Sequence, residues 1–399
     1  MIDPFVAASP VLKELEDAGF EAYFVGGSVR DFLLNREIND VDIATSATPN
    51  EVKRIFPKTV DIGIEHGTVL VLVNNGEYEI TTFRTESEYQ DYRRPKEVSF
   101  IRNLKEDLQR RDFTMNAIAM DRNRKLIDPF NGFNAIKERI IQTVGSPNDR
   151  FQEDALRMMR AVRFVSQLSF QIEDETIQAL TRLAHLLDNI AVERKRAEFE
   201  KLLIGKNKNN ALKLLLDANI HSFLPDLKEQ RQQLEKLIRF NSTNLNKNEM
   251  WSLLIYCLNL QQKEIELFLK EWRLALKDIR EIQLVVHFLS KRLEQDWSIY
   301  DLYSAGRDHI LSTEKLYQVI NGNNEAESIE YWLKLYENLP IKERSEMNVT
   351  GNDVMTWFNK SGGPWLKETL LTIEENILAG KLENDIEKIK EWLIKCNQK

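Results

Sequence analysis

Hydrophobic residues follow two different periods along the chain, and the change falls near residue 145. Before it, short apolar runs predict strands in FEAYFVG, DVDIAT and HGTVLVLVNNGEYEITTFR, and the NNG inside the last run indicates a β-hairpin. After about residue 148, apolar residues recur at the 3.6-residue spacing of helices. The pattern predicts an N-terminal part that is α/β or α+β, followed by an all-helical remainder.

Composition adds few constraints on partners and location. The net charge of −8 and the pI near 5.5 argue against a uniformly basic, nucleic-acid-binding surface, although 30% charged residues of both signs allow a local basic groove. Cys257 and Cys396 have no paired spacing, which favours a reducing compartment without disulfide or zinc. The first residues do not read as a leader, and no apolar run is long enough to cross a bilayer. We therefore expect a cytoplasmic protein without a membrane partner.

Two acidic residues lie two positions apart in the second predicted strand. Because successive strand side chains alternate between faces, Asp40 and Asp42 are expected on one side, with Val41 and Ile43 toward the core. Two hard carboxylates with few other ligands suit Mg²⁺, which keeps waters and is completed by substrate phosphates. A loop start with a capping and a solvated aspartate would look the same, so the pair alone does not decide.

A glycine pair separates a predicted strand from a predicted helix in YFVGGSVRDFLL. Gly26 and Gly27 at such a turn let backbone N–H groups approach a phosphate, and a helix N-terminus favours an anion. Arg30 either contacts a triphosphate or pairs with Asp31 or a nearby glutamate. GGxVRD followed at this distance by DVD is a joint signal of higher specificity than either motif.

The stretch DRFQEDALRMMRAVRFVSQL (149–168) is predicted to be a helix with two opposed faces. One face is an apolar arc of Phe151, Ala155, Met158, Met159, Val162 and Val165, and the opposite stripe consists of Arg157, Arg160 and Arg163. A solvated stripe supported by Asp154 is the common explanation. Three arginines without an equal number of acids favour an anionic nucleotide nearby instead.

These motifs resemble the nucleotidyltransferase superfamily, and within it the bacterial-type tRNA nucleotidyltransferases, or CCA-adding enzymes, with their poly(A) polymerase relatives. The resemblance continues in the family's order through RRDFTMNAIA (110–119), DPFNG (128–132), EDALRMMRAVRF (153–164) and AVERKRAEFEKLL (191–203). It covers about residues 24–203. It implies an α+β fold, in which a polymerase-β-like nucleotidyltransferase head at 1–145 contains a mixed sheet of roughly five strands. A helical neck at 146–205, a helical body at 206–275 and a helical tail at 276–399 would follow.

The resemblance also implies roles for individual residues. Asp40 and Asp42 would be the catalytic Mg²⁺ ligands, with Glu79 and Asp112 as candidates for a third carboxylate. Nucleotide binding is implied for Gly27, Arg30, Arg111, Asp154, Arg157, Arg160 and Arg163, and ribose recognition for Asp112 and Asn116. The polar segment 81–100 matches a flexible family loop, with Asp91, Arg93 and Arg94, unless it is an ordinary connection. Glu193 and Arg194 would support the base-reading residues, unless their helix is simply an exposed charged one.

Asp154 and Arg157 have, by this resemblance, the role of a protein template that reads the base. Cytosine and adenine both present an exocyclic amine beside a ring-nitrogen acceptor, which a carboxylate and a guanidinium match. Guanine and uracil present a carbonyl and a ring N–H there, so each side chain would meet the wrong partner. One pair of side chains can therefore accept CTP and ATP without a nucleic-acid template.

The sequence thus predicts template-independent addition of C, C and A to the 3′ end of tRNA from CTP and ATP, with release of pyrophosphate. The tail is expected to bind the outer arm of the tRNA. The alternatives are an A-adding enzyme that acts with a separate CC-adding enzyme, and a poly(A) polymerase with the same head. A non-catalytic helical RNA-binding protein is disfavoured because Asp40 and Asp42 are both present.

Overall fold

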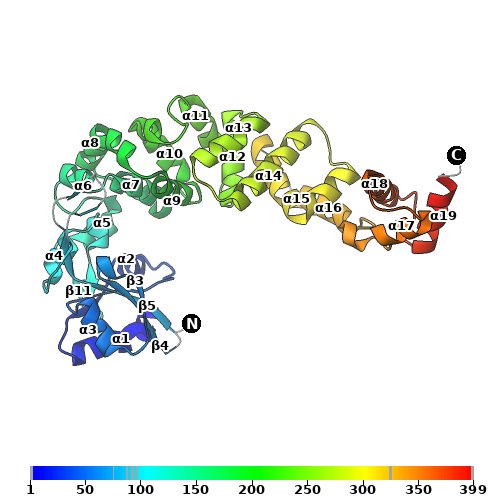
Figure 1. The fold of residues 1–399 in the computed structure, drawn as a ribbon. Coiled ribbons are helices and arrows are strands. Elements are labelled where there is room, and N and C mark those ends of the chain that lie inside the picture. The colour runs from blue at the N-terminus through cyan, green and yellow to red at the C-terminus, as the bar shows by residue number, and fades with distance from the viewer. Residues whose placement is uncertain are drawn as a thin grey trace. The chain divides into compact units, whose positions relative to one another are not determined.

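The computed structural model describes residues 3–74, 76–86, 89–90, 94–95, 98–322 and 326–396. The chain divides into two compact units, Met1–Gln232 and Gln233–Lys399 (Figure 1). In the described residues, the first unit combines a sheet with helices, and the second is helical. This confirms the α+β class with a helical remainder. The finer division into head, neck, body and tail stays a prediction.

A mixed sheet forms the centre of the first unit. Among the described residues it has seven strands in the order β11-β10-β1-β2-β5-β4-β3, in which only β2 and β5 are parallel neighbours. The strands are Ala22–Val25 (β1), Asp42–Thr45 (β2), Thr59–Gly63 (β3), Thr68–Val73 (β4), Gly76–Thr82 (β5), Ala119–Met120 (β10) and Leu126–Ile127 (β11). The mixed sheet is confirmed. The predicted strand number is too low because two-residue strands such as β10 and β11 carry no periodic signal.

The predicted hairpin is confirmed within the main sheet as β4 and β5, which pair antiparallel up to Val73 and Gly76.

Shorter strand pairs lie outside the main sheet. The remaining described pairs are Arg84–Glu86 (β6) with Val98–Phe100 (β9), Tyr89–Gln90 (β7) with Arg94–Pro95 (β8), and Ile140–Ile141 (β12) with Gln171–Ile172 (β13). Because β13 lies after residue 148, the prediction that strands stop there is wrong for these two residues.

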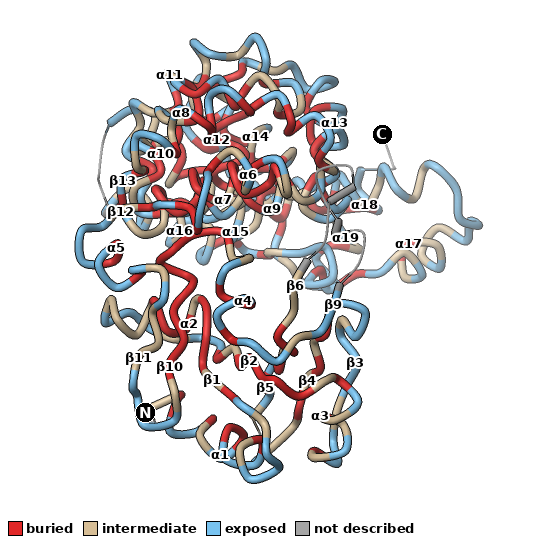
Figure 2. Tube along the Cα trace, turned by 90° about the vertical axis from the view of Figure 1, so that its left-hand side faces the viewer, coloured by how far each residue is buried: buried red, intermediate tan, exposed pale blue. Residues whose placement is uncertain are grey.

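Helices cover the sheet and then continue the first unit. They are Pro4–Asp17 (α1), Gly27–Leu33 (α2), Pro49–Ile55 (α3), Leu104–Gln109 (α4), Gly132–Glu138 (α5), Pro147–Glu153 (α6), Leu156–Leu168 (α7), Asp174–Leu183 (α8), Val192–Leu203 (α9) and Lys208–Asp217 (α10). α1 and α3 pack on β4, β5 and β1, while α7 packs against α9 and α10. Figure 2 shows β1 and β10 buried, whereas the edge strand β3 is largely exposed.

The predicted helix at 149–168 is interrupted at Asp154. α6 ends at Glu153, Asp154 has φ −137° and ψ 102°, and α7 begins at Leu156. The Asp154 carboxylate Oδ1 accepts the Leu156 N–H at 3.0 Å, so this residue satisfies a free donor at the start of α7. The opposed faces therefore exist, but on α7 alone, and Asp154 stands in the break.

The second unit is built from helix pairs around apolar clusters. After Arg231–Arg239 (α11), which spans the unit boundary, the helices are Lys247–Leu258 (α12), Gln262–Glu271 (α13), Leu276–Glu294 (α14), Ile299–Asn321 (α15), Ala326–Glu337 (α16), Gly351–Phe358 (α17), Pro364–Leu378 (α18) and Ile386–Cys396 (α19). One cluster is centred on Trp297 and Ile310, and another on Ile373 and Ile389. Asn246 caps the N-terminus of α12, where its side chain accepts the Glu249 N–H. In the described residues, no helix has the length and apolar character needed to cross a membrane.

Candidate active site

Segments far apart in the sequence meet at the end of β1. Gly26 follows β1 with φ 72°, and a Cβ at this position would lie 3.3 Å from Arg111 Nη1 and 3.5 Å from Asp42 Oδ2. Glycine adopts this conformation without strain and leaves the space open. Since α2 begins at Gly27, the predicted glycine turn is confirmed, and it adjoins the DVD motif and Arg111.

The two aspartates are not both in a strand. Asp42 is the first residue of β2 and pairs with Val25, the last residue of β1, so Asp40 lies beyond the paired residues. The prediction of a strand through both carboxylates is wrong in this respect, because β1 turns away at the glycine pair. Val41 and Ile43 are buried as expected.

The surroundings of Asp42 fit a divalent cation. Burial raises the pKa of this carboxyl group, the charges of Glu79 and Asp40 raise it further, and Arg111 acts in the opposite direction. Glu79 precedes Ile80, which pairs with Ile43, so it neighbours Asp42 across the sheet. Hard oxygen ligands with excess negative charge suit such an ion. In the described residues, no group of three or more His, Cys, Asp or Glu side chains is arranged to hold a metal ion. Mg²⁺ held by one or two carboxylates usually keeps several waters and is completed by substrate phosphates.

Asp107 on α4 fixes the position of Arg111. Asp107 was not among the site residues predicted from the sequence. Its carboxylate is 1% exposed and accepts Arg110 Nη2 at 2.7 Å, Arg111 Nη2 at 3.2 Å and the Arg84 N–H at 3.3 Å. Burial works to raise its pKa, but the two guanidinium charges outweigh this and lower it. The i,i+3 and i,i+4 spacing to Arg110 and Arg111 is a signal that could have identified it.

Asp112 and Asn116 form the centre of a buried hydrogen-bonded network. Asp112 accepts the Asn116 amide at 3.0 Å and Arg160 Nε at 2.7 Å, and Asn116 Oδ1 accepts Arg30 Nη1 at 2.8 Å. Burial opposes the charge of Asp112, but Arg160 and the Asn116 amide hold its pKa well below the ordinary value. Because the Asp112 carboxylate is paired with Arg160, it is not free as a third metal ligand, and Glu79 is the acid that neighbours Asp42. Arg30 also forms an ion pair with Asp31 at 2.8 Å.

The arginine stripe of α7 is neither solvated nor without acids. Arg157 and Arg163 are buried, and each arginine of the stripe forms an ion pair outside α7: Arg157 with Glu153 at 2.6 Å, Arg160 with Asp112 at 2.6 Å, and Arg163 with Glu198 at 3.0 Å. Both the solvated explanation and the argument from missing acids are therefore wrong. Burial lowers the pKa of Arg163 to about 10. Their contacts with a nucleotide stay a prediction.

The two base-reading candidates are each held by a neighbour. Asp154 accepts Arg194 Nη2 at 2.8 Å and Nη1 at 3.4 Å, so the supporting contact expected of α9 is present, whereas Glu193 is exposed. Arg157 Nη2 donates to the Arg110 carbonyl at 3.1 Å, in addition to its ion pair. These contacts orient both side chains at the start of α7.

The residues predicted to form a flexible loop lie largely outside the described residues. Asp91 and Arg93 are not among the described residues, and of Arg94 only the backbone, in β8, is described. The roles expected for all three stay predictions.

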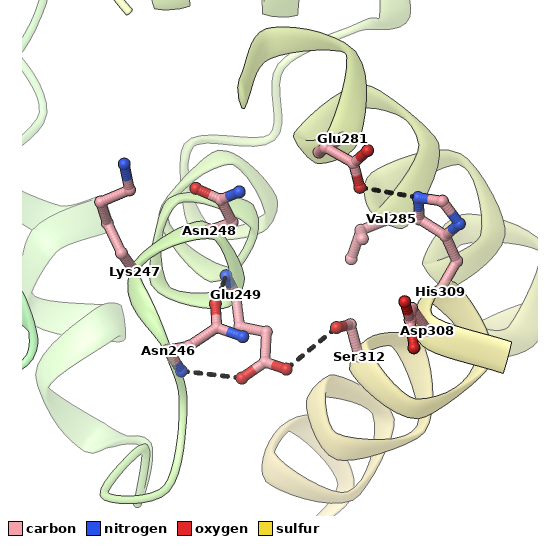
Figure 3. Close-up of a pocket in the computed structure, with 9 residues that line it drawn as sticks. All are labelled: Asn246, Lys247, Asn248, Glu249, Glu281, Val285, Asp308, His309 and Ser312. Atoms are coloured by element: carbon pink, nitrogen blue, oxygen red, sulfur yellow. Dashed lines mark hydrogen bonds and ion pairs between the residues drawn. The ribbon is translucent and has the colours of Figure 1, made fainter. Parts of the chain in front are cut away.

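A polar pocket of about 300 Å³ lies in the second unit, between α12, α14 and α15 (Figure 3). Its groups largely bond one another. The buried Glu249 accepts the Asn246 N–H at 2.7 Å and the Ser312 hydroxyl at 3.0 Å, and His309 Nε2 lies 3.0 Å from Glu281. These bonds join the three helices.

The mixed sheet, the glycine turn and the carboxylate pair place the chain among the nucleotidyltransferases, and comparison with known proteins supports this. Residues 22–142 match the family model of the poly A polymerase head domain, and 169–231 the probable RNA and SrmB-binding site of polymerase A. Residues 243–393 match a putative tRNA nucleotidyltransferase domain 2.

Individual relatives are similar over the whole chain. The CCA-adding enzyme of Geobacillus sp. (strain WCH70) is 49% identical, covering 100% of this chain and 98% of its own. That of Bacillus cereus (strain 03BB102) is 47% identical over 98% and 99%. The crystal structure of the Bacillus stearothermophilus CCA-adding enzyme in complex with CTP has a TM-score of 0.92 at 43% identity, covering 100% of this chain and 98% of that one. The chain belongs to the CCA-adding enzyme family.

Proposed function

We propose that this protein adds C, C and A to the 3′ end of tRNA, without a nucleic-acid template, from CTP and ATP with release of pyrophosphate. Family membership over the full length supports the overall reaction. The observation that carries the chemical assignment is the meeting of Gly26, Asp42 and Arg111 within a few ångströms, from three separate motifs.

Asp40 and Asp42 are the proposed metal ligands, and Mg²⁺ is the proposed ion. When bound, the ion would supply activation of the tRNA 3′-hydroxyl for attack on the α-phosphorus and would stabilise the leaving pyrophosphate. Asp42 itself is held by its pairing with Val25, so its carboxylate has a defined place at the end of the sheet. Glu79 is the proposed additional acidic neighbour.

Gly27, Arg30 and Arg111 are the proposed contacts to the triphosphate. Gly26, directly before α2, lies next to the Arg111 guanidinium, which Asp107 anchors. The N–H groups at the start of α2 and this guanidinium would therefore meet the same phosphates. Asp112 and Asn116 are proposed to meet the ribose hydroxyls, with Arg160 and Arg163 nearby as further nucleotide contacts. Each of these polar side chains already has a protein partner, so a nucleotide would enter an ordered site.

Asp154 and Arg157 are proposed to read the base. The carboxylate would accept the exocyclic amine of cytosine or adenine, and the guanidinium would donate to the ring nitrogen beside it. A carboxylate has room for about four hydrogen bonds, and Asp154 already accepts two from Arg194 and one from the Leu156 N–H, so it can accept one more. Arg157 would exchange one of its present contacts for the base.

The remaining assignments are proposals of the same kind. Asp91, Arg93 and Arg94 would belong to a loop that serves the final adenosine addition. The helical tail at 276–399 would bind the outer arm of the tRNA. A cytoplasmic location is proposed because tRNA is processed and used there.

The test is an incorporation assay with purified protein, Mg²⁺ and three tRNA forms, ending at the unpaired base before CCA, at C and at CC. We expect CTP to be used on the two shorter forms and ATP on the CC form alone. Use of ATP with no use of CTP on any form would indicate an A-adding enzyme, and long A tracts on unrelated RNA would indicate a poly(A) polymerase.

The matched variants are Asp42→Ala and Asp61→Ala. Asp61 lies on the edge strand β3 of the same sheet and pairs with Lys53, away from the proposed ligands. Asp42→Ala should reduce kcat by at least about a hundredfold, because one of two protein ligands is lost. Asp61→Ala should act like the parent. Equal rates for Asp42→Ala and the parent would refute the metal assignment.

A further inference from the structure

The aromatic ring of Phe164 on α7 is surrounded by guanidinium groups. The Cζ atoms of Arg163, Arg30 and Arg160 lie 4.2, 5.2 and 5.7 Å from the ring centroid. All three distances are within the range of a cation–π interaction. Phe113 contacts the ring edge-on, at 5.8 Å between centroids and 90° between planes, and the ring is only 4% exposed.

Three positive groups close to one ring repel each other, so their positions need compensating interactions. Carboxylates supply part of this compensation: Asp31 for Arg30, Asp112 for Arg160, and Glu198 for Arg163. The acids approach from α2, from the segment before Phe113 and from α9. The ring supplies the rest, because the negative face of an aromatic quadrupole attracts a desolvated cation where an aliphatic side chain would not.

Two of these arginines are also the two ends of one chain of hydrogen bonds. Arg30 Nη1 donates to Asn116 Oδ1 at 2.8 Å, the Asn116 amide donates to Asp112 Oδ1 at 3.0 Å, and Arg160 Nε donates to Asp112 Oδ2 at 2.7 Å. Both ends of this chain are guanidinium groups that contact Phe164. Displacing either arginine would therefore shift the Asp112–Asn116 pair.

We propose that Phe164 is a positioning residue for the incoming nucleotide. Its ring holds three arginines in the orientation in which Asp112 and Asn116 meet the ribose and the guanidinium groups face the nucleotide. Phe164 itself touches neither substrate nor metal. This inference rests on the proposed function, and it adds that nucleotide affinity and the preference for ribose over deoxyribose depend on the electrons of a buried ring.

Graded fluorination of this ring is the test. Mono-, di- and trifluorophenylalanine, placed at position 164 of the full chain, weaken the negative face stepwise and change the volume little. We expect KM for CTP to rise stepwise, by about three- to tenfold in all, with kcat changed by less than about twofold. The ratio of kcat/KM for CTP to that for dCTP should fall in the same order. Phe164→Leu should show the full effect if it folds.

Phe56, fully buried at the end of α3 in the same unit, is the control position. In the described part of the chain, no guanidinium lies over its ring. Fluorination there should leave KM and the CTP/dCTP ratio unchanged. A flat KM across the series at position 164, or an equal rise at position 56, would overturn the inference. Either result would leave CTP incorporation by the parent intact, so the two proposals fail separately.

Discussion

Replacing Asp107 by asparagine tests whether this buried carboxylate anchors the active-site arginines. The change keeps size and shape, and its Oδ1 can still accept the Arg84 N–H and Arg110. On the other side, however, the new Nδ2 group would point its hydrogens at the Nη2 of Arg111, donor against donor. The negative charge shared by two guanidinium groups is lost as well.

The expected loss of stability follows from how far Asp107 and its two arginine partners are buried. Removing one side of a buried ion pair costs about 3 to 5 kcal/mol. Here the aspartate is 1% exposed but the Arg110 and Arg111 side chains are 17% and 18% exposed, so water can partly rehydrate them. We therefore expect Asp107→Asn to lower the free energy of unfolding of the first unit by about 2 to 4 kcal/mol at pH 7. KM for CTP should rise too, because Arg111 loses its anchor.

Urea unfolding followed by far-UV circular dichroism measures this free energy, and the tryptophans give an internal reference. All seven lie from residue 251 onward, so their fluorescence reports the second unit. Asp17→Asn is the control, since Asp17 forms an exposed pair with Lys13, and it should cost less than about 0.5 kcal/mol.

The pH dependence provides a second test of the same carboxylate. Because the pKa of Asp107 is lower in the folded than in the unfolded chain, its contribution to stability is complete above the unfolded pKa of about 4 and is lost as the pH falls below it. The difference in free energy of unfolding between the parent and Asp107→Asn should therefore become smaller as the pH falls below about 5. A difference below about 1 kcal/mol at pH 7, or one that stays constant down to pH 3, would refute the reasoning.

Three further outcomes are expected. Gly26→Ala should destabilise the first unit by about 1 to 3 kcal/mol in urea and slow incorporation, because of the positive φ and a methyl group near Arg111, and parent-like behaviour would contradict this. Arg194→Ala should reduce the kcat/KM preference for CTP over UTP by about tenfold, since Asp154, the carboxylate proposed to read the base, loses its orienting partner, and an unchanged preference would argue against that role. A thiol reagent at about pH 8 should modify one cysteine of the native protein rapidly, because Cys396 is exposed whereas burial raises the pKa of Cys257 to about 12; two fast cysteines would contradict this.

Local patterns predicted much of the fold and part of the site. The hairpin, the glycine turn before α2 and the buried arc of α7 follow from hydrophobic periodicity and from the backbone freedom of glycine, which act over a few residues. The break at Asp154 was missed because periodicity is insensitive to a single non-helical residue, even though aspartate is a common helix cap.

The sequence by itself determined the order of the motifs, the α+β head with helices after it, and the presence of an acid pair beside a glycine turn. Only the tertiary structure decided which charges meet. Glu198 and Asp112, which are far from α7 in the sequence, form ion pairs with arginines that had no evident acidic partner in the sequence. The guanidinium groups of these arginines also lie over the ring of Phe164. The physical reason is that helical and strand periods are properties of neighbouring residues, whereas ion pairs and cation–π contacts depend on distances that arise only when remote segments pack together.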